Sequence, residues 1–251
     1  MPSGGLVGAI PARFASSRLP GKPLLPIAGK PMIEHVYRRV ATVDALDRVV
    51  VLTDDERIVD AVEGFGGEAL MTPVDCPSGT DRIAFAARTW DCHAVINVQG
   101  DEPLIDPNAV SRLARLMKGN PSVEMATLAA PLDPDRFSDP NAVKVVTALD
   151  GTALYFSRAP IPHDRDGSGH AVEPRLHLGL YGYRRDVLLR LAELEPTPLE
   201  RSESLEQLRA LEHGIKLQVI TLDAAAEPGV DTREDLERTA LRLAEAAEDT
   251  P

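Results

Sequence analysis

Cations gather in the loop that follows the first apolar run of the chain. The run LVGAI, residues 6–10, has the character of a buried strand, and Arg13, Arg18 and Lys22 come after it. Arginine forks and a compact lysine charge can neutralise a polyphosphate, and Gly21 would let the backbone approach it closely. The segment matches neither the dinucleotide fingerprint GxGxxG nor the P-loop fingerprint. The alternative is a solvated surface loop.

Two carboxylates stand where a metal ion could share oxygen ligands with phosphate groups. The apolar run AVINVQ, residues 94–99, ends in an acidic turn that contains Asp101, and Asp231 comes directly before a helical pattern. Mg²⁺ takes hard oxygen ligands of this kind together with phosphate oxygens. An ordinary acidic turn is the alternative for Asp101, and a plain helix N-cap is the alternative for Asp231. The metal interpretation requires the two carboxylates to lie together in the fold.

Polar side chains elsewhere offer hydrogen bonds to a ligand. The stretch CPSGTDR, residues 76–82, supplies hydroxyls and backbone groups at a helix start, where they could read a base edge or cap the helix. His177 and Tyr181 are four apart on a predicted strand and so share a face, with core packing as the alternative. Glu206 and Gln207 lie beside the apolar stripe of a predicted helix, where polar residues are usually solvated.

The charge balance limits the kind of ligand. The 251 residues are 43% hydrophobic and 26% charged, as in an ordinary globular protein, and the formal net charge is −12. Residues 1–40 hold six Lys or Arg and one acid, a net charge of +5, so the rest of the chain carries −17. A local positive field on an acidic protein favours a small anionic ligand. It argues against binding to nucleic acid or to an anionic membrane surface.

The sequence carries no recognisable membrane span or secretory signal. No apolar run approaches the length of about 18 residues that a membrane helix needs, and the N-terminus has no basic segment before an apolar core. Cys76 and Cys92 form no CxxC pattern and are expected to be thiols, buried or solvated. We therefore expect a cytoplasmic protein.

Short apolar runs alternate with amphipathic helices over the first half of the chain. This alternation predicts the α/β class: a mostly parallel, Rossmann-like sheet with helices on both faces. Thr80 or Asp81 is the predicted cap of the third helix. The predicted elements are strands at 6–10, 48–53, 68–71 and 94–99, and helices at 31–42, 55–65, 80–90 and 106–117.

The alternation of strands and helices stops in the second half, where predicted strands follow one another without helices. We predict a smaller antiparallel lobe at about 131–185. Residues 1–247 are interpreted as one α/β domain, with 248–251 as a frayed tail, and Asp231 or Thr232 is the predicted cap of the closing helix. The elements predicted here are strands at 142–148, 152–158, 176–184 and 215–222, and helices at 185–194, 202–214 and 231–248.

Nine segments within residues 8–238 form a recognisable series: IPARFASSRLPGKPL, GKPMIEHV, SGTDR, NVQGDEP, NAVKVV, ALYFSRAPIP, HLGLYGYR, LEQLR and GVDTREDLE. In this order they resemble the CMP-Kdo synthetase (3-deoxy-manno-octulosonate cytidylyltransferase) family. The resemblance implies a nucleotidyltransferase fold and CTP-dependent activation of a 2-keto-3-deoxy sugar acid, most simply Kdo. The sugar would attack the α-phosphate of CTP through its anomeric hydroxyl, giving a CMP-sugar and pyrophosphate.

The resemblance also implies which residues carry catalysis. Arg13 and Lys22 would hold the triphosphate, with Arg18 nearby. Asp101 and Asp231 would ligate Mg²⁺. Charge neutralisation and positioning of this kind suit in-line phosphoryl transfer, which needs no nucleophilic side chain.

The remaining polar residues would bind the nucleotide and the sugar acid. Those that the resemblance places near the nucleotide are Ala12, Ser78, Gly79 and Gln99. Those that it places near the sugar acid are Gln99, Arg165, His177, Tyr181, Glu206 and Gln207. The lobe at about 131–185 would serve sugar binding and homodimer formation, as is usual in the family.

Several features depart from the family pattern, and they lie on the sugar side. Leu176 stands where a basic residue is frequent, His163 stands where an aromatic residue is typical, and Ser202 and Ser204 flank Glu203 in an unusual segment. The chemistry could therefore act on a different ulosonate, such as an amino-substituted Kdo. A non-catalytic nucleotide-binding protein is a second alternative. A generic Rossmann oxidoreductase is disfavoured because its glycine fingerprint is missing.

Overall fold

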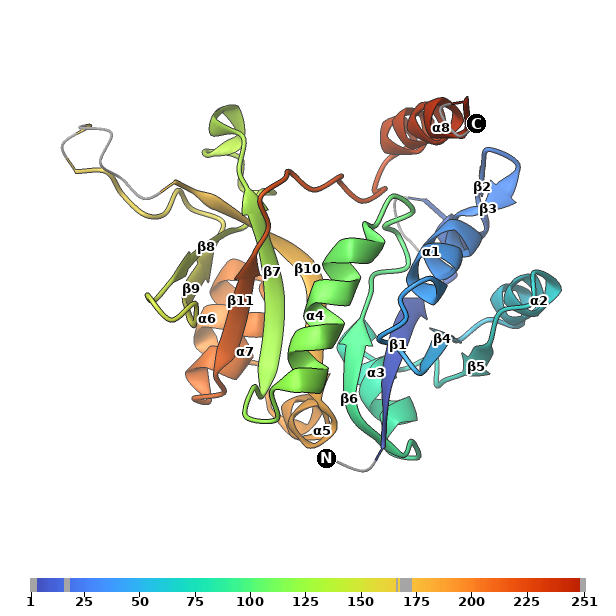
Figure 1. Cartoon of the computed structure of the whole chain (residues 1–251), viewed down its shortest axis with the longest axis horizontal. Helices are drawn as coiled ribbons and strands as arrows, with labels where there is room; N and C mark the ends of the chain where they lie inside the picture. Colours follow the sequence, from blue (N-terminus) through green and yellow to red (C-terminus); the bar gives the residue numbers. More distant parts are fainter. Residues whose placement is uncertain (1–3, 16–18, 166, 168–172, 249–251) are drawn as a thin grey trace.

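A nine-stranded sheet forms the centre of the protein, whose structure, a computed structural model, describes residues 4–15, 19–165, 167 and 173–248 (Figure 1). The main path of the sheet runs β11-β7-β10-β6-β1-β4-β5, and β8 pairs with β10 and with β9. The strands are β1 (Gly5–Ala12), β4 (Arg48–Thr53), β5 (Ala69–Met71), β6 (Cys92–Asn97), β7 (Met125–Pro131), β8 (Lys144–Thr147), β9 (Ala153–Ser157), β10 (Arg175–Arg184) and β11 (Leu217–Thr221).

Every strand of the main path except β10 runs in the same direction. β10 is antiparallel to both β6 and β7, and the other neighbours on the path are parallel pairs. This mixed, mostly parallel sheet confirms the predicted α/β class. The carboxyl ends of the parallel strands consequently meet at one edge, where ligands bind in folds of this type.

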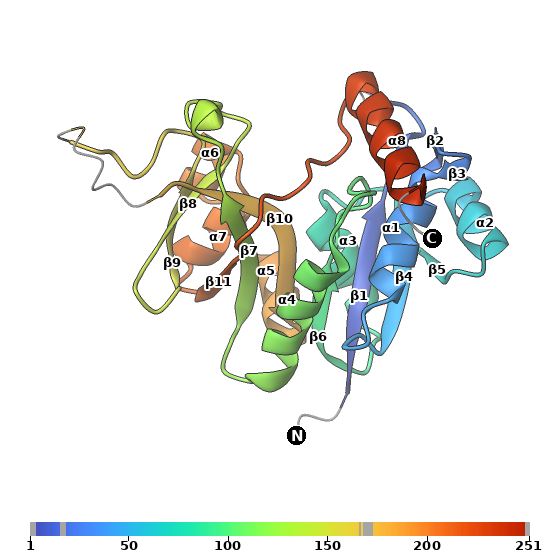
Figure 2. The same ribbon diagram turned by 45° about the horizontal axis from the view of Figure 1, so that its top comes forward.

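Helices cover both faces of the sheet (Figures 1 and 2). β1 shows why: Leu6 and Ile10 point to one face and Val7 and Ala9 to the other, and all four are buried. The helices packed on the Leu6 side are α1 (Met32–Ala41), α2 (Glu56–Gly64) and α4 (Pro107–Gly119). Those packed on the Val7 side are α3 (Gly79–Ala87), α5 (Arg185–Glu193) and α7 (Gln207–Glu212), with α6 (Pro198–Glu203) beside α7.

The antiparallel strands of the second half are hydrogen-bonded into the same sheet. β8 pairs with the first residues of β10, and β9 pairs with β8. A short 3₁₀ turn, η2 (Pro134–Arg136), lies between β7 and β8. Because β10 continues from these strands into the space between β6 and β7, the antiparallel block is an extension of the main sheet.

Two local predictions were wrong. The helix predicted at 202–214 is two helices, because Ser204 takes a left-handed conformation (φ 53°) that ends α6. Helix α3 is capped by Ser78 and not by Thr80 or Asp81. Ser78 Oγ accepts from the Asp81 amide at 3.1 Å, and an Asp81 carboxylate oxygen accepts from the Ser78 amide at 3.1 Å.

The chain after β11 crosses the carboxyl edge of the sheet to reach α8 (Arg233–Glu248) (Figure 2). There Leu236 packs on a small apolar cluster with Leu19, Ile27, Met32 and Val230. The loop after β1 contributes Leu19 and Leu25, which flank the 3₁₀ turn η1 (Lys22–Leu24), and Ile27 of β2 (Pro26–Ile27), which forms a hairpin with β3 (Lys30–Pro31). The two segments that carry Lys22 and Asp231 are thus held together by the same cluster.

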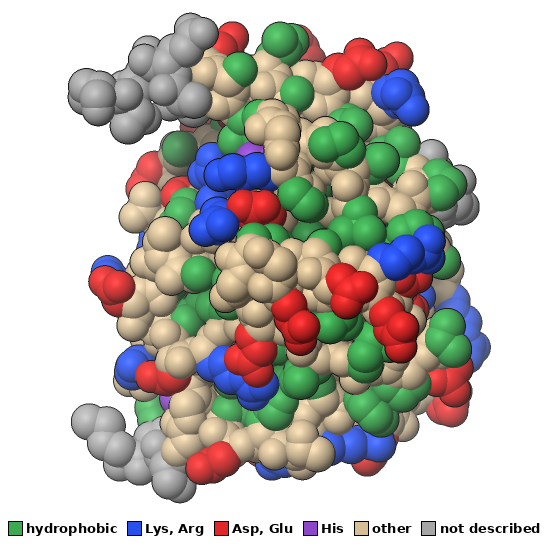
Figure 3. All heavy atoms as spheres, turned by 90° about the vertical axis from the view of Figure 1, so that its right-hand side faces the viewer, with side chains coloured by type: hydrophobic (Ala, Val, Ile, Leu, Met, Phe, Trp, Pro, Cys, Tyr) green, Lys and Arg blue, Asp and Glu red, His purple; other side chains and the backbone are tan. Residues whose placement is uncertain are grey.

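The side of the molecule formed by α1, α2 and α8 carries acidic and basic side chains interspersed with apolar ones (Figure 3). Within the described ranges, no helix combines the length and the apolar character that crossing a bilayer requires.

Candidate nucleotide and sugar site

A cavity of about 360 Å³ opens where β1 and β6 end. The loop after β1 and the acidic turn after β6 form its walls, and the segment before α8 closes it. The predicted residues that line it are Ala12, Arg13, Lys22, Gly79, Gln99, Asp101 and Asp231. The fold thus brings the predicted phosphate-binding cations and the predicted metal ligands into one place.

Lys22 lies between the two predicted metal ligands. Its Nζ donates to Asp101 Oδ2 at 2.6 Å and to Asp231 Oδ1 at 3.1 Å. The lysine side chain is 11% exposed, whereas the side chains of Asp101 and Asp231 are 40% and 56% exposed. The carboxylates therefore converge on one cation and still face the open cavity.

The alternative of a plain N-cap at Asp231 is excluded by the start of α8. Thr232 Oγ accepts from the Asp235 amide at 3.1 Å, and Asp235 Oδ2 accepts from the Thr232 amide at 2.9 Å. This reciprocal pair is a capping box, so the helix needs nothing from the Asp231 carboxylate. The backbone next to Asp231 is tied to the acidic turn, because the Val230 amide donates to the Asp101 carbonyl at 2.8 Å.

Arg13 reaches across the opposite wall of the cavity. Its Nη2 donates to the carbonyl of Cys76, in the loop before α3. Gly100 allows the acidic turn to lie against β1, because a Cβ there would come within 2.8 Å of the Pro11 carbonyl oxygen. Arg18, also predicted at the triphosphate, lies outside the described residues.

The donor set suits a cation shared with phosphate. Among the described residues no group of three His, Cys, Asp or Glu side chains could enclose a metal. Burial, and then the neighbouring charge of Asp101, raise the pKa of Glu102 to about 8, so Glu102 adds no third negative charge at neutral pH. Two carboxylates already meeting on the Lys22 ammonium fit Mg²⁺, which typically takes one or two carboxylates and completes its shell with phosphate oxygens and water.

A second cavity of about 170 Å³ adjoins the first and shares Gly79 and Gln99 with it. Four of the predicted sugar-binding residues line it: Gln99, Tyr181, Glu206 and Gln207. Burial raises the pKa of Glu206, although hydrogen bonds from Thr80 and Ser78 oppose the shift. This cavity is small, polar and lined by groups that can bond to hydroxyls.

His177 lies beside Tyr181, with ring centroids 5.4 Å apart, and its other neighbour is the buried ring of Phe156. Its Nε2 is 3.2 Å from Thr127 Oγ. Thr127 donates its hydroxyl proton to backbone carbonyls of β10, so the imidazole is the donor in this pair and keeps Nδ1 as an acceptor. Burial lowers the pKa of His177 to about 3, so the ring is neutral at physiological pH.

This depressed pKa predicts acid sensitivity of the fold. The pKa in the unfolded chain is about 6.5, so protonation favours unfolding, and the stabilisation present above pH 6.5 is lost as pH falls towards 3. Between pH 6.5 and 4.5 we expect wild type to lose about 1–2 kcal/mol more unfolding free energy than His177→Gln. Urea unfolding at both pH values measures this difference. His213 is exposed, so His213→Gln should lose as much unfolding free energy between the two pH values as wild type. If His177→Gln also loses as much as wild type, the depressed pKa of His177 is contradicted.

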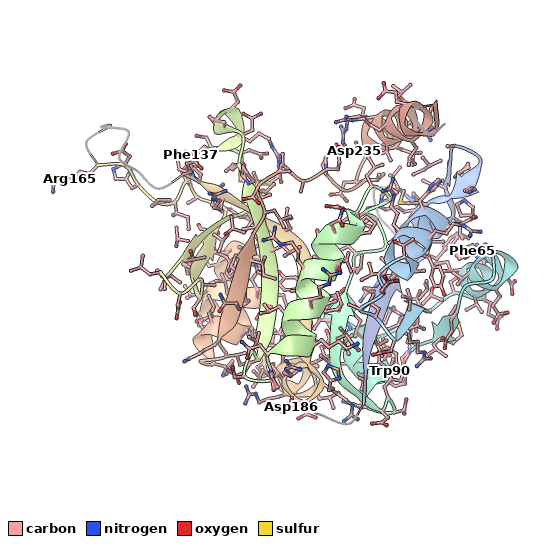
Figure 4. All side chains as sticks on the ribbon, in the orientation of Figure 1. Phe65, Trp90, Phe137, Arg165, Asp186 and Asp235 are labelled. Atoms are coloured by element: carbon pink, nitrogen blue, oxygen red, sulfur yellow. The ribbon has the colours of Figure 1, made fainter. Side chains whose placement is uncertain are left out.

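Arg165 is not brought to either cavity. Figure 4 places it at the outer end of the segment between β9 and β10, away from the carboxyl edge of the sheet. The reason is that residues 158–165 extend outward from the body of the protein. Arg165 is therefore not among the described residues that line these two cavities.

Asn97 and Tyr183 also line the second cavity and were not singled out from the sequence. Asn97 is 2% exposed, and its Oδ1 is buried without a hydrogen-bond partner among the described residues. Burial raises the pKa of Tyr183 far above its usual range, against hydrogen bonds from Thr80 and Asn97. The polar Asn97 within the apolar run AVINV was the available signal, because a buried amide requires partners.

Comparison with known proteins places the chain in a family. A family model described as cytidylyltransferase matches residues 7–217. The 3-deoxy-manno-octulosonate cytidylyltransferase of Syntrophotalea carbinolica is 51% identical over 246 residues, which cover 95% of this chain and 98% of that protein. The corresponding protein of Myxococcus xanthus is 57% identical over 213 residues, covering 84% and 86%.

Solved structures agree with this assignment. The structure of a CMP:2-keto-3-deoxy-manno-octonic acid synthetase complexed with CTP superposes with a TM-score of 0.93 at 44% identity, covering 96% of this chain and 99% of that one. The fold, with cations and paired carboxylates at the carboxyl edge of its sheet, defines a nucleotidyltransferase. The chain belongs to the cytidylyltransferase family, among the 3-deoxy-manno-octulosonate cytidylyltransferases. The resemblance found in the sequence is confirmed.

Proposed function

We propose that the protein transfers the cytidylyl group of CTP to the anomeric hydroxyl of Kdo. The hydroxyl loses its proton as its oxygen bonds to the α-phosphorus, and the bond from that phosphorus to the leaving pyrophosphate breaks. The observation that carries the proposal is the meeting of Lys22, Asp101 and Asp231 in one cavity with Arg13. It is supported by the relatives that cover nearly the whole chain.

The residues of the first cavity would position and neutralise the triphosphate. Arg13 offers a planar fork fixed by the Cys76 carbonyl, and Lys22 offers a compact charge on a tight turn. Mg²⁺, held by Asp101 and Asp231, would supply Lewis-acid neutralisation of phosphate charge when bound. These groups act by orientation and electrostatics, which contribute most to phosphoryl transfer.

The second cavity would hold the hydroxyl groups of the sugar acid. Gln99 stands between the two cavities, and its Nε2 donates to the Gly179 carbonyl at 3.2 Å. Glu206 and Gln207 offer an acceptor and a donor on the side of α7. His177 does not line this cavity; it lines a separate cavity of about 480 Å³ together with Leu178 and Gly179. A neutral His177 could accept a hydrogen bond from a sugar hydroxyl at Nδ1 only from that side, without serving as a base.

Asn97 gives this assignment a specific prediction. We expect Asn97→Leu to raise KM for Kdo about tenfold while KM for CTP stays within twofold, because a buried acceptor for a sugar hydroxyl is worth about 1–2 kcal/mol. Steady-state kinetics with each substrate varied in turn measures both constants. A parallel rise in both KM values would show that Asn97 supports the fold instead of the sugar. Asn97→Asp, which keeps an acceptor oxygen, serves as the matched variant.

Pyrophosphate release tests the proposed reaction. With Mg²⁺ and CTP present, we expect release with Kdo and none without a sugar. An amino-substituted Kdo and a sialic acid should be run beside it, because release only with one of these would keep the chemistry and change the substrate. Failure with every acid, from folded protein that still binds CTP, would support the alternative of a nucleotide-binding protein.

We also propose that the protein forms a homodimer through its antiparallel strands. The hairpin of β8 and β9 exposes large apolar side chains, with Leu154 61% exposed and Leu149 fully exposed at the turn. Exposed apolar groups of this kind are typical of association surfaces. Light scattering after size exclusion would measure the mass, and Leu154→Glu should shift it to that of a monomer.

A further inference from the structure

We propose that Lys22 acts as a placeholder for the divalent cation. Its ammonium group lies between Asp101 and Asp231, so the metal binds tightly only when a triphosphate draws Lys22 away. This inference rests on the proposed function, because it assigns the carboxylates to metal and Lys22 to phosphate. It adds an order: the cation joins the site with the nucleotide and not before it.

The backbone at Lys22 is held in a fixed position, which suits the placeholder role of its side chain. The residue begins η1, directly after Gly21, whose left-handed φ of 68° makes the turn possible. The Lys22 amide donates to the Leu19 carbonyl at 3.1 Å, and Leu19 is part of the apolar cluster under α8. The side chain is thus presented from an anchored turn and is the least exposed of the three charged groups.

The carboxylates are brought together independently of the ammonium. The hydrogen bond from Val230 to the Asp101 carbonyl joins their backbones, and a Cβ at Gly229 would lie only 3.3 Å from that carbonyl oxygen. Two carboxylates held this close repel each other unless a cation lies between them. A single site for positive charge therefore exists whether Lys22 or a metal ion fills it.

The two occupants exclude each other. A metal ligand oxygen must approach Mg²⁺ to about 2.1 Å, where an ammonium bonded to the same oxygens would be in direct contact with the ion. The like charges would repel strongly at that separation. A bound triphosphate gives Lys22 another anionic partner, so nucleotide and metal should each increase the affinity for the other.

Arg13 provides the matched comparison. It carries the same charge and lines the same cavity, but it donates to the Cys76 carbonyl, whereas Lys22 donates to the two carboxylates. Removing Arg13 changes the general field of the cavity, whereas removing Lys22 also vacates the space between the carboxylates. The two effects can therefore be told apart.

Mn²⁺ binding in the absence of nucleotide tests the proposal, with the free ion followed by electron paramagnetic resonance. We expect Lys22→Met to bind Mn²⁺ about tenfold more tightly than wild type, as for a site that is blocked roughly nine-tenths of the time. Arg13→Met should change the affinity by no more than about twofold. Asp101→Asn added to Lys22→Met should abolish the gain.

Equal or weaker Mn²⁺ binding by Lys22→Met would overturn the placeholder role, and so would an equal gain in Arg13→Met. Circular dichroism shows whether Lys22→Met folds. If it does not, Lys22→Gln serves as the second variant. Pyrophosphate release by wild type is measured separately. Its absence would remove the proposed function, whereas unchanged metal affinity with normal release would remove only the placeholder.

Discussion

Asp101→Asn is expected to lower kcat for pyrophosphate release about 100-fold or more, equivalent to roughly 3 kcal/mol of transition-state stabilisation. Among the described residues, this carboxylate is one of two that meet at the Lys22 ammonium, and an amide carries no charge to replace it. The measurement is initial-rate release of pyrophosphate at saturating CTP and Kdo, with Mg²⁺ titrated. The Mg²⁺ concentration that gives half-maximal rate should rise, and the maximal rate at saturating Mg²⁺ should fall.

The same substitution should leave the fold intact, because the Asp101 side chain is 40% exposed. Asp106→Asn is the matched control. Asp106 caps α4 by accepting from the Asn108 amide, and asparagine caps a helix equally well, so this variant should keep both activity and stability. Wild-type turnover in Asp101→Asn would remove this carboxylate from the metal site.

Local signals in the sequence were sufficient to predict much of this site. The cations after the first strand and the acidic turn after residue 99 could be recognised because the carboxyl ends of parallel strands share one edge. The residues that cap α8 had to be found from the structure. Thr232 and Asp235 have the spacing of a capping box, but the spacing alone does not show that this pair caps α8 while the Asp231 carboxylate accepts from Lys22.

Contacts between distant segments were not predictable in the same way. The succession of strands without helices after residue 131 indicated antiparallel strands. It did not indicate that β10 lies between β6 and β7, because strand order depends on packing across the whole sheet. Ser204 ended a helix that the apolar periodicity continued through, because a single left-handed residue has no periodic signal. Arg165 could not be placed by pattern, since its segment extends from the body.

One such distant contact is the ion pair between Asp54, which follows β4, and Arg82 of α3. Arg82 is fully buried, and its Nη2 donates to Asp54 Oδ2 at 2.8 Å, across 28 positions of the chain. Its Nη1 donates to Thr72 Oγ, at the start of the loop whose Cys76 carbonyl holds Arg13. The pair thus joins the end of β4 to α3 and supports the loop whose Cys76 carbonyl accepts from Arg13.

Asp54→Ala is therefore expected to lower the free energy of unfolding by about 3 kcal/mol or more, because it leaves the Arg82 charge buried without its partner. Urea unfolding at neutral pH measures the loss. In the fraction that remains folded, KM for CTP should rise several-fold, since the loop that positions Arg13 loses its support.

The control removes the acid from an exposed pair of the same type. Glu68 pairs with Arg48, whose side chain is 34% exposed, so Glu68→Ala should lower the unfolding free energy by less than about 1 kcal/mol. The double variant Asp54→Leu with Arg82→Met, which removes both charges, should recover part of the stability lost in Asp54→Ala, because the penalty comes from the unpaired charge. If Asp54→Ala loses no more stability than Glu68→Ala, the buried pair does not support the loop that holds Arg13. The position of Arg13 would then depend on its hydrogen bond to the Cys76 carbonyl and not on the ion pair.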